Sequence, residues 1–359
     1  MRAPTISQVA KEAGISVATV SRVINQKGGV TPETAQKVMQ AIQRLGYQPN
    51  VWGRNLRRGE SQVVLVMVPN VTNPYYAPII AGAEDTFSAA GYSIMLCITN
   101  MDPARRGNYL DLMRNRRADG AILMDVSMDD RNMVQLAGEY PLVQCCEYCD
   151  SKDISHVSID NFSAAREAVS RLAALGHTRI GYIGAKNSFI STAQRQEGYQ
   201  SALEELGIGL RPDYEESAGR DYSFSTGVEA AGRLLDRAER PTALFCVSDM
   251  LALGAVQAAR ERGLRIPEDL SIVGFDDVEY ASMFQPRLTT IRQPCYRIGA
   301  LAASLLLRQM QGESGRQAVF LPHEWVPRDS TAAWPLNDTD PGKQFLRRKN
   351  KLNSQNWPR

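Results

Sequence analysis

The spacing of apolar residues along the chain changes character near residue 60. Before this point apolar residues recur three and four positions apart, which is the spacing of one face of an α-helix. Beyond it, short runs that are apolar throughout alternate with amphipathic helical stretches. The pattern therefore predicts a small all-α part followed by a larger α/β part.

Three short helices are expected in the first part. Thr5 and Ser7 can cap the first, Ser16 the second and Thr31 the third, because their side-chain oxygens accept from backbone N–H groups that a helix leaves free. Pro32 then takes the first helical position of the third helix. The predicted buried stripes are Val9, Ala10 and Ala13; Val20, Val23 and Ile24; and Val38, Ile42 and Leu45.

A short turn at Gly14 separates the first two helices, as in a helix-turn-helix, whose second helix enters the DNA major groove. Arg22 can donate two hydrogen bonds to guanine, Ser21 can bond a base or a phosphate, and Val17 and Ala18 can contact thymine methyl groups. A helical bundle with a merely solvated polar face is the alternative. Candidates for phosphate contacts are Thr5, Ser16, Thr19, Asn25 and Thr31.

Charge supports a nucleic-acid partner for this part. Residues 1–60 hold nine Lys and Arg against three Asp and Glu, whereas residues 61–359 hold 32 against 36. The basic residues are thus concentrated where the helix-turn-helix is predicted. A second basic stretch, 343–359, is polar and lacks periodicity, so residues 336–359 are expected to form a disordered tail.

The apolar runs after residue 60 predict strands that are covered on both faces, which is typical of parallel sheets with flanking helices. They fall into two groups, so we expect two doubly wound lobes with a ligand cleft beyond the carboxyl ends of their strands. The runs are VVLVMV, SIMLCI, GAILM and PLVQC, then RIGYIG, TALFCV and SIVGF.

Aromatic and charged residues follow these strands or lie on loops that face the other lobe. Aromatic rings can stack on a flat ligand, and Arg and Asp side chains can bind its hydroxyl or amide groups. The alternatives are a structural ion pair between Arg195 and Asp276, and core positions for Tyr75 and Phe224. The candidate effector residues are Asn73, Tyr75, Tyr76, Glu147, Arg195, Phe224, Asp249 and Asp276.

The six cysteines are expected to stay reduced, in a cytoplasmic protein without a metal or another cofactor. Cys145, Cys146, Cys149 and His156 resemble an incomplete metal site, but Cys145 and Cys146 are adjacent in an expected strand and would face opposite sides. The start of the chain lacks an apolar signal segment, and no apolar run approaches the length of a membrane span. The expected location is therefore the cytoplasm, at the nucleoid.

The segments TISQVAKEAGISVATVSRVINQ and VTPETAQKVMQAIQRLGYQPN resemble the DNA-binding headpiece of the lactose/galactose repressor family. The following NVWGRNLRRGES resembles the hinge helix of that family, which binds the minor groove. The resemblance implies DNA contacts for Asn50 and Arg54 and a wedge role for Leu56. Gly53 replaces the usual Ala and weakens such a helix; a flexible basic linker is the alternative.

The sensor segments VPNVTNPYYAPIIAGAE, GHTRIGYIG, PTALFCVSDMLALGAV and GLRIPEDLSIVGFDD resemble the same family, so the resemblance covers residues 3–335. It implies a headpiece at 1–48, a hinge at 49–60 and a bilobal sensor at 61–335. The expected N-lobe is about 61–160 and 292–320, and the expected C-lobe about 161–290 and 322–335. It also implies a homodimer on palindromic operator DNA, since one headpiece covers half a palindrome.

Within the family, the segments ALFCVSDMLALGA and LLLRQMQG are most similar to the branch that responds to cytidine. This similarity implies a nucleoside or pentose-type sugar as effector, and an operator shared with the cyclic-AMP receptor protein. NSFISTAQ and the pair Tyr75 and Tyr76 depart from that branch, so the effector stays open. A periplasmic-type sugar-binding protein without a DNA role is the alternative, and no catalytic motif predicts an enzyme.

Overall fold

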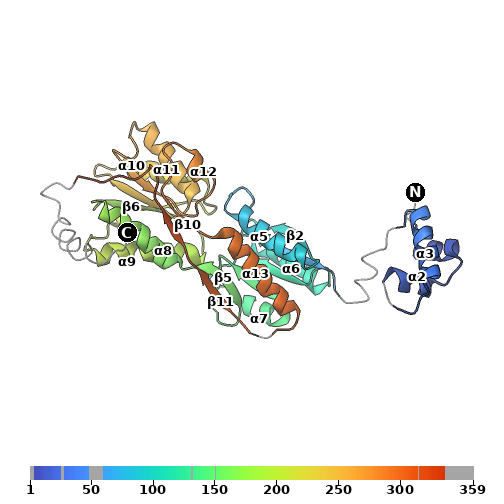
Figure 1. Cartoon of the computed structure of the whole chain (residues 1–359). Helices are drawn as coiled ribbons and strands as arrows, with labels where there is room; N and C mark the ends of the chain where they lie inside the picture. Colours follow the sequence, from blue (N-terminus) through green and yellow to red (C-terminus); the bar gives the residue numbers. More distant parts are fainter. Residues whose placement is uncertain are drawn as a thin grey trace, which may run out of the picture. The chain divides into compact units, whose positions relative to one another are not determined.

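The computed structural model describes residues 4–25, 28–47, 60–130, 132–149, 151–313 and 315–335. The chain divides into two compact units, Met1–Ser61, here called the headpiece, and Gln62–Arg359, here called the sensor (Figure 1). The all-α headpiece and the α/β sensor confirm the fold class predicted from the sequence. Each unit is described by itself.

Each headpiece helix begins at a residue whose side chain accepts a backbone hydrogen bond. Thr5, Ser16 and Thr31 are the N-caps, as predicted, and Ser7 lies inside the first helix instead of capping it. Thr5 and Gln8 form a reciprocal pair in which each side chain bonds the other's backbone N–H. The helices are α1 (Ile6–Ala13), α2 (Val17–Ile24) and α3 (Pro32–Leu45).

The headpiece core is one small apolar cluster. Val9, Val20 and Val38 come from the three helices and are fully buried. Ala10, Ala41 and Tyr47 complete the buried set, with Val23 and Ile24 packed against it. Since one stripe of each helix supplies this cluster, the opposite face of α2 stays in solvent.

The sensor contains two parallel sheets. The larger has the strand order β11-β5-β4-β3-β1-β2, and the smaller has the order β7-β6-β8-β9. In the larger sheet the strands are β1 (Val63–Val68), β2 (Ser93–Ile98), β3 (Gly120–Leu123), β4 (Leu142–Cys145), β5 (Ser155–Ile159) and β11 (Ala318–Leu321). In the smaller they are β6 (Ile180–Ala185), β7 (Glu215–Ala218), β8 (Ala243–Cys246) and β9 (Ser271–Val273).

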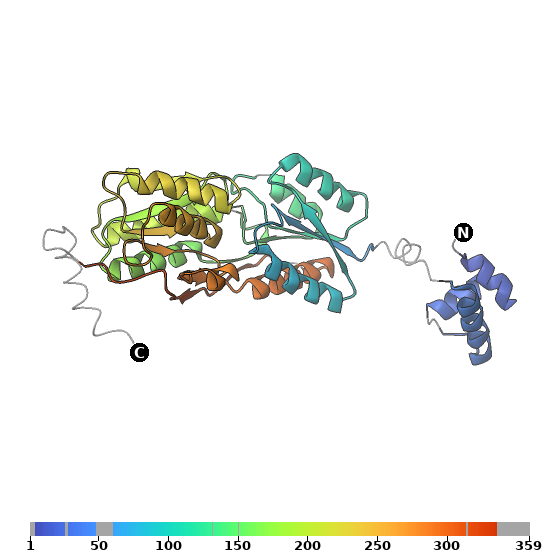
Figure 2. The same cartoon turned by 90° about the horizontal axis from the view of Figure 1, so that it is seen from above.

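Helices cover both faces of the larger sheet, which we call the N-lobe. In β1, Val64 and Val66 pack in the core on one side, whereas Leu65 and Met67 pack in a second core on the other. The first side carries α5 (Tyr76–Ala89) and α13 (Cys295–Met310), and the second carries α6 (Pro103–Arg114) and α7 (Asn132–Glu139) (Figure 2).

The smaller sheet, which we call the C-lobe, is covered in the same way. Figure 1 shows α8 and α9 on one side of β6 and α10 and α11 on the other. A short antiparallel pair, β10 (Thr290–Arg292) and β12 (Glu324–Val326), connects the lobes. The remaining elements are α8 (Asn161–Ala174), α9 (Ile190–Glu205), η1 (Pro212–Tyr214), α10 (Phe224–Leu235), α11 (Asp249–Glu261) and α12 (Tyr280–Met283).

Two expectations about the strands of the sensor were wrong. β2 is an edge strand, so Met95 and Leu96 are 40% and 43% exposed instead of covered on both faces. Cys146 lies beyond the end of β4 with φ of 68°, which turns its side chain back, and its Sγ is 3.8 Å from that of Cys145. The two thiols therefore face one another and do not point to opposite sides of the sheet.

Helix pairs in the sensor approach closely at glycines. A Cβ on Gly299 of α13 would lie 1.9 Å from the backbone oxygen of Ile79 in α5, and one on Gly82 would lie 2.0 Å from that of Tyr296. These distances leave no space for a methyl group, and backbone cannot give way as a flexible side chain does. The α5–α13 contact therefore depends on two residues without side chains.

We predict that Gly299→Ala destabilises the sensor by about 1–3 kcal/mol, because the added methyl group overpacks the contact. Gly107 in α6 is the control: nothing lies within 4 Å of its virtual Cβ, and Ala there should stabilise by roughly 0.5–1 kcal/mol. Thermal unfolding followed by circular dichroism measures both. Equal shifts in the two variants would contradict the packing argument.

Candidate functional site

One face of α2, together with its N-cap Ser16, forms an exposed surface on the headpiece. Ser16, Val17, Ala18 and Arg22 are exposed, whereas Val20 on the opposite side is fully buried. Val17, at 43%, is one of the large apolar side chains that the headpiece leaves in solvent. Exposed methyl groups are unfavourable in water, so the Val17 side chain is suited to an apolar contact, such as one with the methyl group of thymine.

The polar residues of the same helix are held by short local bonds. Ser16 Oγ lies 2.9 Å from Thr19 Oγ1, and the Asn25 amide donates to the Ser21 carbonyl at 2.7 Å. Thr5 and Thr31 stand exposed at the N-termini of α1 and α3. Hydroxyls and free N–H groups at helix starts are well suited to phosphate oxygens. Asn50, Arg54 and Leu56 lie outside the described residues.

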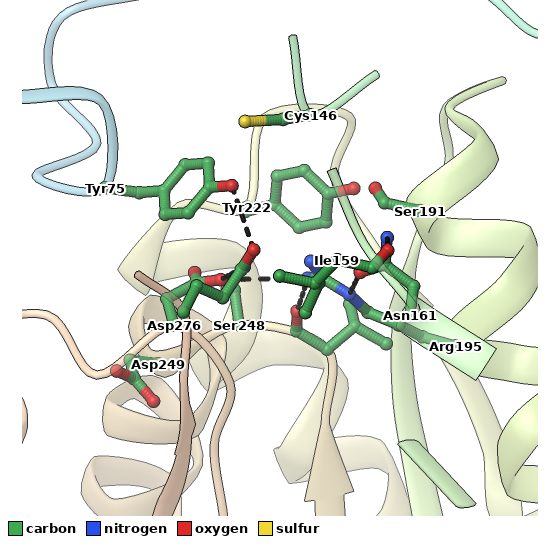
Figure 3. A network of polar contacts seen from close by, with 12 residues as sticks. Tyr75, Cys146, Ile159, Asn161, Ser191, Arg195, Tyr222, Ser248, Asp249 and Asp276 are labelled. Atoms are coloured by element: carbon green, nitrogen blue, oxygen red, sulfur yellow. Dashed lines mark hydrogen bonds and ion pairs between the residues drawn. The ribbon is translucent and has the colours of Figure 1, made fainter. Parts of the chain in front are cut away.

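In the sensor, Arg195 of α9 lies at the centre of a buried polar network between the lobes (Figure 3). Its Nε donates to Asn161 Oδ1 at 2.9 Å and its Nη1 to the Val247 carbonyl at 2.6 Å. The guanidinium lies 3.7 Å from the ring centre of Phe275 and 3.8 Å from the Asp276 carboxylate. The side chain is thus buried and held by Asn161, Val247 and Phe275.

Glu147, which follows β4 in the N-lobe, crosses to the C-lobe. Its carboxylate accepts from Ser191 Oγ at 2.5 Å and from Ser191 N at 3.2 Å. Burial raises the pKa of Glu147, although the bonds from Ser191 and the charge of Arg195 oppose the rise. Beside it, Thr192 and the Tyr222 hydroxyl form a short hydrogen bond.

Asp276, which follows β9 in the C-lobe, is joined to the N-lobe through Gln293. The Gln293 amide donates to Asp276 Oδ1 at 2.8 Å, and the Tyr75 hydroxyl donates to Gln293 Oε1 at 3.2 Å. Burial raises the pKa of Asp276 to about 7, against the opposing effects of Arg195 and Gln293. Burial also raises the pKa values of Tyr75 and Tyr76, so both hydroxyls keep their protons.

Five of the eight candidate effector residues belong to this group: Tyr75, Tyr76, Glu147, Arg195 and Asp276. The other three take different positions. Asn73 Oδ1 accepts from Tyr75 N at 3.0 Å and so orients the start of α5. Asp249 is fully buried and accepts from Thr290 Oγ1 and Val278 N, at 2.6 and 2.8 Å, so the structure gives it a role within the C-lobe. Phe224 is half-buried at the start of α10.

The group contains residues that sequence reasoning did not select. Asn161 follows β5, whose sequence SHVSI is too polar to be recognised as a buried strand, and Tyr222 follows β7, whose sequence EESA has the same property. Applying the strand-end rule to these strands would have identified both. The further residues that Figure 3 places in the group are Cys146, Ile159, Ser191 and Ser248.

A cavity of about 630 Å³ lies next to this group, between α6, α7 and the C-lobe loops at 187–189 and 220. None of the eight candidate residues lines it. Asn187 stands between the two regions: it lines the cavity and accepts from Thr192 Oγ1 at 2.8 Å. We place the candidate site at the Arg195 group, because the converging charges lie there.

Comparisons with known proteins agree with both units. Residues 5–50 match "Bacterial regulatory proteins, lacI family", and residues 169–331 match "Periplasmic binding protein-like domain". The repressor CytR of Escherichia coli is 37% identical over 335 residues, which cover 93% of this chain and 98% of the relative. The chain belongs to the lacI family.

Solved structures of lacI-family proteins extend the likeness. A lac repressor dimer bound to operator and the anti-inducer ONPF is 28% identical, with a TM-score of 0.83, and the match covers 92% of this chain and all of that one. A lacI-family regulator of Enterococcus faecium with bound ribose is 29% identical, with a TM-score of 0.68, over 76% of this chain and all of that one. This lacI-family chain is a DNA-binding transcriptional repressor controlled by a small-molecule effector.

The described residues contain no set of three or more His, Cys, Asp and Glu side chains placed to hold a metal ion. Cys145, Cys146 and Cys149 are free thiols in the core. His156 stacks on Tyr148 at 4.0 Å between ring centres. These residues thus serve the interior of the N-lobe.

We predict that Asp276→Asn gains stability over the wild type as pH rises. The pKa of Asp276 is raised to about 7 in the folded protein, from an ordinary value near 4. Between these two pH values the folded wild type holds a proton that the unfolded chain has lost, so the free energy of unfolding of the wild type falls as pH rises. The gain grows from about pH 4 to 7 and then levels off, at about 1.4 kcal/mol per unit of raised pKa.

Unfolding midpoints between pH 4 and 9 measure this gain. Asp269→Asn is the control, because the half-buried Asp269 pairs with Arg265 and its pKa is lowered, not raised. A constant difference between Asp276→Asn and the wild type across this range would show that the carboxyl does not titrate there.

Proposed function

We propose that this protein is a cytoplasmic homodimer that represses transcription from a palindromic operator and responds to a nucleoside or pentose-type sugar in the interlobe cleft. The observation that carries the DNA role is the exposed face of α2: Val17 and Ala18 in its first turn and Arg22 in its last turn are exposed, and Val20 is buried on the opposite face. We propose no catalytic role, since the relatives are transcription regulators.

In this proposal α2 enters the major groove with its N-terminus first. Arg22 donates to a guanine, Val17 and Ala18 contact thymine methyl groups, and Ser21 bonds a base or a phosphate. Thr5, Ser16, Thr19, Asn25 and Thr31 bond phosphates and fix the register. The resemblance supports minor-groove contacts for Asn50, Arg54 and Leu56. It also supports a headpiece that ends at residue 48, a hinge that ends at residue 60, a sensor that ends at residue 335 and a tail that follows it.

The effector is proposed to bind where the two lobes meet at Arg195. The aromatic rings of Tyr75 and Tyr222 (Figure 3), and of Tyr76 packed edge-on against Tyr75, offer faces for a ring-shaped ligand. Arg195 and Asp276 offer a donor and an acceptor. The ribose in the similar Enterococcus faecium structure supports a pentose, and the similarity to CytR supports a nucleoside. An operator shared with the cyclic-AMP receptor protein stays a prediction.

Two apolar patches support a dimer. Met95 and Leu96 are exposed on the edge strand β2, and Tyr280, Met283 and Phe284 are exposed on or next to α12. The similar lac repressor structure is a dimer on its operator. We propose that a second copy covers these patches, which places two α2 helices on the two halves of the operator.

No described helix is long and apolar enough to cross a membrane.

Operator binding with and without effector tests the function. We predict that Arg22→Ala lowers the ratio of operator to random-duplex affinity by about 5- to 150-fold, because a bidentate contact with guanine contributes roughly 1–3 kcal/mol of discrimination. Electrophoretic shift at fixed salt measures the ratio. Lys37→Ala, which removes an exposed charge on α3, is the control and should leave it unchanged. An unaltered ratio in Arg22→Ala would refute this reading of α2.

We predict that Met283→Lys converts the dimer to a monomer and lowers operator affinity, because a buried unpaired charge opposes association. Sedimentation velocity measures the oligomeric state. Met283 is 59% exposed in the single chain. The control is Leu210→Lys, at a residue that is also exposed but lies outside both patches. A dimer that persists in Met283→Lys would show that α12 is not in the interface.

A further inference from the structure

Five helices begin at the cleft site, because each follows a strand of a parallel sheet whose carboxyl end points there. Figure 3 labels a residue at the start of each: Tyr75 before α5, Asn161 in α8, Ser191 in α9, Tyr222 before α10 and Ser248 before α11. Backbone N–H groups at helix N-termini attract anions. If these groups were free, their convergence would favour an anionic effector.

Protein oxygens already accept from the first turns of all five helices. At the start of α9, Asn187 of the same lobe accepts from Phe189 N at 3.2 Å, and the Glu147 carboxylate of the opposite lobe accepts from Ser191 N, also at 3.2 Å. In the other four, Asn73 accepts from Tyr75 N at 3.0 Å, Asp160 from Ser163 N at 2.9 Å, Ser223 from Thr226 N at 3.4 Å and Ser248 from Leu251 N at 3.3 Å.

The charges of the site also favour donors on the ligand. Glu147 and Asp276 both reach it, and Arg195 is the basic side chain that the described network contains. Arg195 already donates to Asn161 and Val247. Two buried carboxyl groups thus accompany one buried guanidinium, and burial raises the pKa of both carboxyls. Their oxygens are hydrogen-bond acceptors, so the site favours donors on a ligand.

We infer that the effector carries several hydroxyl or amino donors and no negative charge, and that Glu147 excludes phosphorylated ligands from the cleft. The inference rests on the proposed function, which places the effector at Arg195. A phosphate at the start of α9 meets the Glu147 carboxylate, which already accepts from Ser191 N and Ser191 Oγ. Like charges brought together in a closed site cost several kcal/mol, which corresponds to about 100-fold or more in affinity.

Two pairs of compounds that differ by one phosphate test the inference: cytidine with cytidine 5′-monophosphate, and D-ribose with D-ribose 5-phosphate. Isothermal titration calorimetry of the full chain should show the neutral member binding at least about 100-fold more tightly. The two arms also distinguish a nucleoside effector from a sugar. A phosphorylated member that binds as tightly as its neutral partner, or more tightly, overturns the inference.

Variants of Glu147 assign the discrimination to this residue. Glu147→Gln keeps an oxygen for Ser191 but removes the charge, so the preference for the neutral member should fall at least tenfold. Glu147→Asp keeps the charge and should retain the preference. Glu324→Gln removes an exposed charge outside the site and is the matched control. A preference that is the same in wild type and Glu147→Gln overturns the role of Glu147.

Inorganic phosphate provides a probe that needs no knowledge of the effector. At equal ionic strength, replacing chloride by phosphate should raise the unfolding midpoint of Glu147→Gln more than that of the wild type, since the start of α9 then accepts an anion. Equal rises overturn the inference, even if none of the four compounds binds. Failure of the proposed function is separate: it would appear as operator affinity that no effector changes.

Discussion

A carboxylate that leaves water when two lobes close must find donors in the protein, and in this sensor Glu147 finds them at the start of a helix in the facing lobe. Ser191 supplies both a hydroxyl and a backbone N–H, at 2.5 and 3.2 Å. The contact joins β4 of one lobe to α9 of the other. It therefore couples the distance between the lobes to the electrostatics of the site, and any ligand must be compatible with it.

The rest of the site follows from the same geometry. Parallel strands place their following loops at one edge of each sheet, and the two edges face each other. Asp276 is then linked through Gln293 to Tyr75 of the N-lobe, and Arg195 lies 3.8 Å from Asp276 within the C-lobe. Because closure buries these groups together, a ligand that binds one arrangement of the lobes better than another shifts their populations. This difference in affinity is the physical basis of an effector response.

The headpiece uses local interactions instead. Thr5, Ser16 and Thr31 fix where its helices begin, and a core of a few side chains around Val9, Val20 and Val38 holds them together. Since so small a core occupies only one stripe of each helix, the other face of α2 is free for DNA. A compact unit with exposed Val17 and Arg22 needs no conformational change of its own to present them.

The sequence by itself determined what depends on neighbours along the chain: the caps and stripes of the headpiece and the α/β character of the sensor. It also selected Tyr75, Glu147, Arg195 and Asp276 as candidates on the segments that follow strands. Tertiary structure decided the rest. Only the fold shows that Asp249 is taken up by Thr290 and Val278, that β2 lies at an edge, and that Cys146 turns back toward Cys145. The reason is physical: caps and periodicity are local, whereas strand order and contacts between lobes join residues far apart in the chain, and no local pattern encodes which of them meet.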